Sequence, residues 1–226
     1  MTVIADQKAG RVLTVLKTRD YQHVSDYLKA LPKTIREQIK AVAMDMWKPF
    51  IKSFTKWCPN ASIVFDPFHV IASFSRVIDK IRSQEYRKAD AAGKALLKKS
   101  RFLLLKNPQN IKKENLPRLK SILENNKLLA QVYMLKDYLK RLWQYRYRKS
   151  AYKFLNYWCA LARETGHVLL IKFAKMLTRH SYGLLNHCRF PISTARLEGI
   201  KVIKRAAYGY RDLEYFKLKI IHSTVQ

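Results

Sequence analysis

Two aspartates stand directly after short apolar runs, Asp45 after "KAVAM" and Asp66 after "ASIVF". If these runs are neighbouring parallel strands, their carboxyl ends meet at one edge of the sheet, where functional sites are usually built. Two carboxylates at short range repel each other unless a cation lies between them or one is protonated. One interpretation is therefore a Mg²⁺ site, because two such ions about 4 Å apart promote phosphodiester chemistry. The alternative is that both aspartates only form turns.

Two further side chains extend this set of candidates. His69 follows Asp66 by three residues and either orients a ligand or phosphate, or simply starts a helix. Glu198 lies in "RLEGIKVIKRAAYGYRD", where lysine and arginine dominate. It has three interpretations: an ion pair with Lys201 one helical turn away, an acidic residue in an RNA-binding patch, or a metal ligand beside a phosphate backbone.

The first 70 residues alternate between strand and helix signals. Residues 2–19 predict a β-hairpin that turns near Gly10, and residues 25–39 predict a helix broken at Pro32. The strands that end at Asp45 and Asp66 flank residues 48–60, whose apolar side chains recur at helical spacing. Strand–helix–strand of this length is the βαβ unit of a parallel sheet, and the hairpin is expected to extend it into a mixed sheet.

Residues 71–185 change character, because strand-like alternation gives way to leucine, tyrosine, lysine and arginine at helical spacing. We expect a helical insertion here. The aromatic and basic run at 142–158 either stacks on nucleic-acid bases or, as we favour, forms one apolar and one solvated helix face. Beyond it, Ser193 or Thr194 is a suitable N-cap for a helix that carries Glu198.

The charge balance points to a polyanionic partner. The 226 residues include 45 Lys and Arg against 16 Asp and Glu, which gives a net charge of +29 and a pI near 10.2. Each phosphate neutralised by such a chain releases condensed counterions, so nucleic acid is the expected partner. A hydrophobic content of 48% is too high for a disordered tail.

Other classes of protein fit the sequence poorly. Three cysteines without a CxxC pattern argue against a thiolate metal site and a disulfide framework, and favour a reducing cytoplasm. No apolar stretch approaches 18 residues, so no membrane span is expected, and the first residues lack the layout of a signal peptide.

Two long segments, "VAMDMWKPFIKSF…CPNASIVFDPFHVI" and "PISTARLEGIKVIKRAAYGYRDLEYFKLKIIH", closely resemble bacterial insertion-sequence transposases of the Asp-Asp-Glu (DDE) class, ISL3 type. The similarity runs from the first hairpin nearly to the end of the chain. It implies an α/β, RNase H-like fold with a large all-helical insertion before the last catalytic helix. It also implies a bacterial, cytoplasmic, nucleoid-associated protein that acts on DNA (element ends and target), with a homodimer left open.

The resemblance assigns roles to the candidate residues. Family acids bind two Mg²⁺ (or Mn²⁺) ions, water attacks the phosphodiester at the element's end, and the freed 3′-OH attacks target DNA. Carried over, Glu198 is the family's glutamate and Asp45 its second aspartate, so both are the expected catalytic and metal-binding residues. Asp66 and His69 match an Asp-x-x-His element of related transposases, and we expect this element to support the site, with Asp66 as the alternative to Asp45. The expected phosphate contacts are made by Arg196, Lys201, Lys204, Arg205 and Arg211.

The same resemblance divides the chain and shows two departures. It predicts a partial RNase H-like core at 1–70, a helical insertion at 71–185, and the catalytic helix with a basic tail at 186–226. The family's first aspartate lies on a strand before the opening hairpin, which these residues do not include, and Asp6 cannot substitute for it. Relatives also carry about four more residues, rich in asparagine, after Ile200.

We therefore expect a transposase DDE catalytic domain that lacks its first acid and first strand, binds DNA, and is inactive as this chain. The alternatives are a non-enzymatic basic nucleic-acid-binding protein, a remnant without a selected function, and an RNase H-like nuclease or resolvase.

Overall fold

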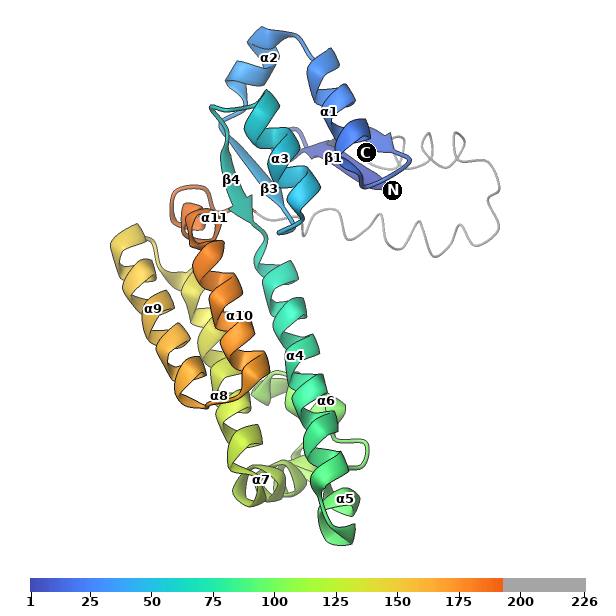
Figure 1. Ribbon diagram of the computed structural model, residues 1–226, viewed down its shortest axis with the longest axis vertical. Coiled ribbons are helices and arrows are strands. Elements are labelled where there is room, and N and C mark those ends of the chain that lie inside the picture. The colour runs from blue at the N-terminus through green and yellow to red at the C-terminus, as the bar shows by residue number, and fades with distance from the viewer. Residues whose placement is uncertain (193–226) are drawn as a thin grey trace. The chain divides into compact units, whose positions relative to one another are not determined.

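The computed structural model describes residues 1–192, which fall into two compact units. The N-terminal unit comprises residues 1–68 together with the described residues from 190, and the helical unit comprises residues 69–189. Figure 1 shows strands and short helices in the first unit and long helices in the second. The predicted segment at 186–226, including Glu198 and all five expected phosphate-contacting residues, lies mostly outside the described residues.

The N-terminal unit begins with the predicted hairpin. Strands β1 (Thr2–Asp6) and β2 (Arg11–Leu16) pair antiparallel, with a register shift between Ile4 and Ala5. The Asp6 carboxylate accepts hydrogen bonds from the backbone N–H groups of Lys8 and Ala9 at 2.8 and 3.0 Å, so Asp6 stabilises the turn. Gly10 completes that turn with a φ of 71°, a conformation that favours glycine.

Two short helices follow, and the break at Pro32 is confirmed. Helix α1 (Tyr21–Ala30) starts at Asp20, whose side chain accepts from the backbone N–H of His23 at 2.9 Å. Helix α2 (Lys33–Gln38) begins directly after Pro32, since proline is tolerated only at the start of a helix.

The predicted βαβ unit is also confirmed. Strands β3 (Ala41–Met44) and β4 (Ser62–Phe65) pair in parallel, and α3 (Lys48–Trp57) connects them. Helix α3 packs on α1, where the buried hydroxyls of Ser25 and Ser53 lie 3.0 Å apart. Two small hydroxyl residues at this contact allow the helices to approach closely while their polar atoms bond each other.

The two strand pairs are not joined to each other. Within the described residues, hydrogen bonds connect β1 only to β2 and β3 only to β4, so there are two two-stranded sheets. The sequence predicted that these strands belong to one mixed sheet, and this stays a prediction, since the described strands form two separate pairs.

The helical unit is built from one long helix and several shorter ones. Figure 1 shows α4, α8, α9 and α10 running alongside one another, with α10 between α4 and α9 in this view. The α-helices are α4 (Pro67–Lys88), α5 (Ala91–Leu97), α6 (Arg101–Leu105), α7 (Leu116–Asn125), α8 (Lys127–Arg141), α9 (Arg148–Glu164), α10 (Val168–Arg179) and α11 (Ser181–Leu185). The 3₁₀ helices are Pro108–Asn110, Lys113–Asn115, Leu142–Gln144 and Asn186–Cys188. The structure thus bears out the helical character predicted after residue 70.

An aromatic cluster forms the core of this unit. Trp158 is fully buried and lies edge-on to Phe74 and Phe173, with ring centroids 5.3 and 5.8 Å away. Its indole N–H donates to the backbone oxygen of Leu135 at 2.9 Å, which satisfies the one polar atom of the side chain. The cluster therefore ties α4, α8, α9 and α10 together.

The aromatic and basic run at 142–158 has both a buried side and an exposed side in the structure. Along α9, buried side chains recur at helical spacing at Ala151, Leu155 and Trp158. Tyr152 and Tyr157 are exposed on the same helix. One face of α9 is therefore apolar and the other solvated, as the more conservative interpretation predicted.

A buried lysine closes the end of α6. The Lys136 side chain is 2% exposed, and its ammonium donates to the backbone oxygens of Leu104 and Lys106 at 2.9 and 2.7 Å. These carbonyls lie at the end of a helix, where the helix itself supplies no donors. Burial lowers the pKa of Lys136 to about 8. The side chain thus has a structural explanation within the helical unit.

Candidate functional site

The two candidate aspartates lie at the same edge of the β3–β4 sheet. Met44 of β3 is paired with Phe65 of β4, and the backbone N–H of Asp66 donates to the oxygen of Met44 at 3.0 Å. Asp45 and Asp66 each follow one of these paired residues. Because neighbouring parallel strands are about 4.8 Å apart, the chain positions of the two aspartates are adjacent, as the sequence predicted.

Asp45 is the accessible member of the pair. Its side chain is 33% exposed, and a carboxylate oxygen lies 3.5 Å from the Arg19 guanidinium. Arg19 is held close by Trp47, whose indole N–H donates to the Arg19 backbone oxygen at 3.0 Å. The guanidinium also lies 5.7 Å from the ring centroids of Trp47 and Phe50.

The Arg19–Asp45 contact is weak enough for a metal ion to replace it. Both side chains are partly exposed, and ion pairs of this kind contribute about 0–1 kcal/mol to stability. A divalent cation attracts a carboxylate more strongly than the singly charged guanidinium does. Arg19 was not among the residues predicted from the sequence, because nothing local to "KTRD" indicates a partner 26 residues away.

Asp66 has a structural role of its own. It is 1% exposed, and its side-chain oxygen accepts from the backbone N–H of Phe68 at 3.0 Å. This contact satisfies one free donor in the first turn of α4, which has Pro67 as its first residue. The turn-forming interpretation of Asp66 is therefore confirmed, whereas its role in supporting a metal site stays a prediction.

His69 is the remaining candidate within the described residues. His69 lies in the first turn of α4 and is half-buried, within the helical unit as the chain divides. Within residues 1–192, no group of three or more His, Cys, Asp or Glu side chains could hold a metal ion. Carboxylate oxygens such as those of the accessible Asp45 are the ligands that suit Mg²⁺ and Mn²⁺.

The cysteines do not extend this donor set. Cys58, Cys159 and Cys188 are free thiols. Burial raises the pKa of all three. They are therefore protonated near neutral pH, whereas a metal ligand has to be a thiolate.

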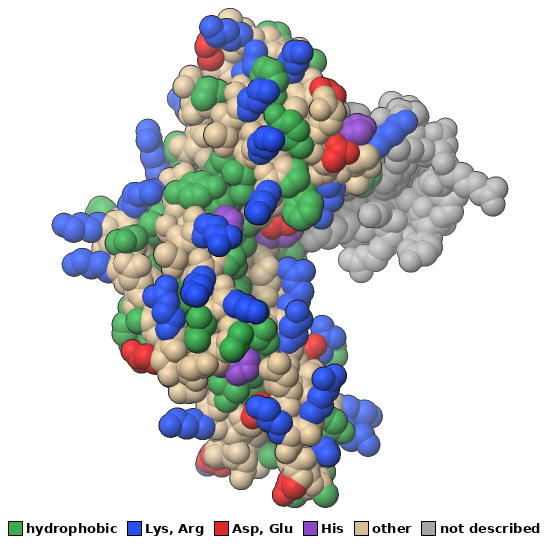
Figure 2. Space-filling model, in the orientation of Figure 1, with side chains coloured by type: hydrophobic (Ala, Val, Ile, Leu, Met, Phe, Trp, Pro, Cys, Tyr) green, Lys and Arg blue, Asp and Glu red, His purple; other side chains and the backbone are tan. Residues whose placement is uncertain are grey.

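Basic side chains are widespread on the surface of the described residues. Figure 2 shows Lys and Arg side chains spread over the visible face of both units, with Asp and Glu in isolated places. No helix in the described part of the chain is both long and apolar enough to cross a membrane.

Comparison with known proteins gives a consistent result. The ISL3-type DDE family model, described as "Transposase", matches residues 1–220. The transposase for insertion sequence element IS1001 of Bordetella parapertussis is 39% identical over 226 residues, covering 97% of this chain and 56% of that protein. The transposase for insertion sequence element IS1557 of Mycobacterium tuberculosis is 22% identical, covering 94% and 54%. No solved structure matches.

The chain thus spans about half the length of the curated relatives that it matches.

Proposed function

Because the chain belongs to the ISL3-type family of DDE transposases, we propose that it is the catalytic domain of a protein that cuts and joins DNA at an insertion sequence. Asp45 and Glu198 are the acids that hold divalent metal ions in this proposal. The supporting observation is the parallel pairing of β3 and β4, which gives Asp45 an accessible position at the carboxyl edge of a sheet.

The role of each group follows from its surroundings. A pair of Mg²⁺ or Mn²⁺ ions supplies a water nucleophile and stabilises the leaving oxygen of the phosphodiester. Asp45 offers carboxylate oxygens at a surface that DNA can reach. Asp66 fixes the start of α4 beside it, which holds the sheet edge in place. Glu198 would supply the second acid, and Arg196, Lys201, Lys204, Arg205 and Arg211 would neutralise the flanking phosphates.

The fold that we propose for the N-terminal unit is RNase H-like. Within the described residues β1 and β3 each pair along one side only, so each has a free edge that can accept a further strand. A strand lying between them would join the two pairs into one mixed sheet. In the family that the chain resembles, that strand carries the first catalytic aspartate, which lies next to the residue that corresponds to Asp45.

The 226 residues themselves do not include that acid, so we expect them to bind DNA without cutting it. Loss of one catalytic group commonly lowers a rate by several orders of magnitude. The test is nicking of supercoiled plasmid in Mg²⁺ and Mn²⁺ by the chain and by its Glu198→Gln variant, with DNA binding measured in parallel. Binding by both proteins and nicking by neither is the expected result.

Two other outcomes would overturn parts of the proposal. Strong metal-dependent nicking that disappears in the Glu198→Gln variant would mean that the chain is active without the first aspartate. Absence of DNA binding at low salt would contradict the assignment of DNA as the partner.

A further inference from the structure

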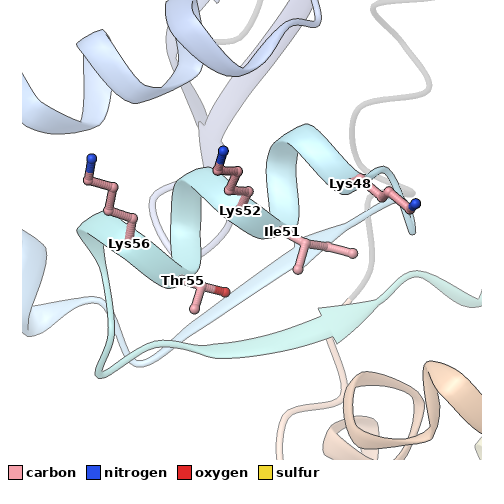
Figure 3. Close-up of a pocket in the computed structure, with 5 residues that line it drawn as sticks. All are labelled: Lys48, Ile51, Lys52, Thr55 and Lys56. Carbon is pink, nitrogen blue, oxygen red and sulfur yellow. The ribbon is translucent and has the colours of Figure 1, made fainter.

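Three lysines follow one another along the outer side of α3, and we call them the lysine ladder: Lys48, Lys52 and Lys56. They line a shallow surface hollow of about 480 Å³ together with Ile51 and Thr55. Figure 3 shows all five side chains on α3, with Lys52 and Lys56 pointing the same way and Lys48 at the start of the helix. Their four-residue spacing separates successive lysines by about 6 Å along the helix axis.

The three lysines of the ladder are not neutralised by acids of the described residues. Helix α3 contains no aspartate or glutamate, and none of the three ammonium groups forms an ion pair with a described carboxylate. Elsewhere, lysines do lie within 3.0–3.8 Å of an acid: Lys33, Lys88, Lys112, Lys120 and Lys140. The ladder differs from these five lysines in that no described carboxylate balances its three neighbouring charges.

Aromatic rings, not carboxylates, flank two of the lysines. The Lys52 ammonium lies 4.6 Å from the centroid of the Tyr21 ring, and the Lys56 ammonium lies 5.0 Å from that of Trp57. Such contacts favour a position for each ammonium and leave its charge available to an anion. A hydrogen bond with Ser25 lowers the pKa of Tyr21, and the Lys56 and Lys52 charges act in the same direction.

The unpaired charges impose a small cost on the free chain. Like charges four residues apart on a helix destabilise it by roughly 0.2–0.5 kcal/mol per pair. A bound polyanion would remove this repulsion and release its own counterions. The ladder is therefore better matched to a phosphate backbone than to water alone.

The position of the ladder relates it to the carboxylate edge. Lys48 follows Asp45 by three residues, and the other two lysines continue along α3 away from the carboxyl ends of β3 and β4. We propose that the lysine ladder binds successive phosphates of a DNA strand that leads to Asp45. This inference deepens the proposed function and rests on it, since it takes DNA as the partner.

The test compares two triple variants of equal charge. The ladder variant carries Lys48→Gln, Lys52→Gln and Lys56→Gln, and the control carries Lys33→Gln, Lys112→Gln and Lys120→Gln, which removes three lysines that already pair with acids. Binding of each protein to one duplex of arbitrary sequence is measured by fluorescence anisotropy over a series of salt concentrations. Thermal unfolding checks that both variants are folded, and the ladder variant is expected to be at least as stable as the parent chain.

The salt dependence of DNA binding shows whether the ladder contacts phosphates. Each lost phosphate contact lowers the slope of log K against log salt by about 0.9, so the ladder variant is expected to lose roughly 2 to 3 and the control less than about 1. If the two variants have equal slopes and the parent chain binds DNA normally, the lysine ladder does not bind the phosphates. DNA would then remain the partner of the chain. Absence of DNA binding by the parent chain would instead contradict the proposed function.

Discussion

The Asp45→Asn variant is expected to bind Mn²⁺ at least about tenfold more weakly than the parent chain. Asparagine keeps the size of the side chain but removes the charge that attracts the ion and the oxygen that binds it most strongly. Groups that only hold a metal ligand in place already contribute 10- to 100-fold to affinity, so a ligand itself contributes no less. The loss of the Arg19–Asp45 contact affects folding by less than about 1 kcal/mol, so the variant remains folded.

This affinity can be measured by titrating the DNA-free chain with Mn²⁺ and following the paramagnetic resonance of the free ion. A net charge of +29 suppresses non-specific binding of cations, which makes a single weak site easier to detect. The matched control is Asp26→Asn, which removes the same charge from an exposed position on α1. Equal affinities of the two variants would contradict the assignment of Asp45 as a metal ligand.

The Trp158→Ala variant is expected to lose about 3–5 kcal/mol of unfolding free energy, the largest effect on stability that we foresee for a single replacement. Trp158 is completely buried, and its removal leaves a cavity between Phe74 and Phe173. Each edge-to-face aromatic pair stabilises the fold by roughly 0.5–1.5 kcal/mol in addition to the energy of burying the apolar surface of the rings. Total stabilities of domains lie near 5–15 kcal/mol, so the helical unit would become marginal.

Chemical denaturation followed by far-ultraviolet circular dichroism measures this loss, because the helical unit contributes most of the helix. Tyr157→Ala is the matched control, since it removes a neighbouring aromatic side chain that is 57% exposed. It is expected to change the stability by no more than about 0.5 kcal/mol. A loss below about 1 kcal/mol for Trp158→Ala would show that the cluster is not the core of this unit.

Local features of the fold could be predicted from the sequence because their signals are local. Apolar runs bounded by turn residues predicted β3 and β4, and Pro32 predicted the boundary between α1 and α2. The helix between β3 and β4 indicated that these strands pair in parallel, and the structure confirms this pairing. It was therefore possible to predict that Asp45 and Asp66 lie at the same edge of the sheet. Gly166, with a φ of 68°, follows the end of α9, where glycine is common.

Features that depend on distant residues could not be predicted. Lys136 resembles every other lysine in its helix, and only its contacts with Leu104 and Lys106, 30 and more residues away, explain its burial. The Arg19–Asp45 contact has the same character, because these residues are 26 positions apart in the chain. In each case the energy comes from groups that the chain brings together only after it has folded.

The charge of the lysine ladder was visible in the sequence, but its availability was not. The spacing of Lys48, Lys52 and Lys56 places them on one side of a helix in any case. In the structure the three lysines are exposed, whereas Ser53 and Phe54 of the same helix are buried. A basic pattern therefore indicates a surface, and the fold decides whether that surface is open to a partner.

The account requires Asp45 and Glu198 to hold the same divalent ion. Replacing that ion with Fe²⁺ and adding ascorbate and peroxide generates radicals that cut the polypeptide close to where the iron is bound, and mass spectrometry locates the cuts. We predict cuts near both residues in the parent chain, and loss of both in the Asp45→Asn variant. Cutting near Glu198 that persists in that variant would show that the two carboxylates do not share an ion.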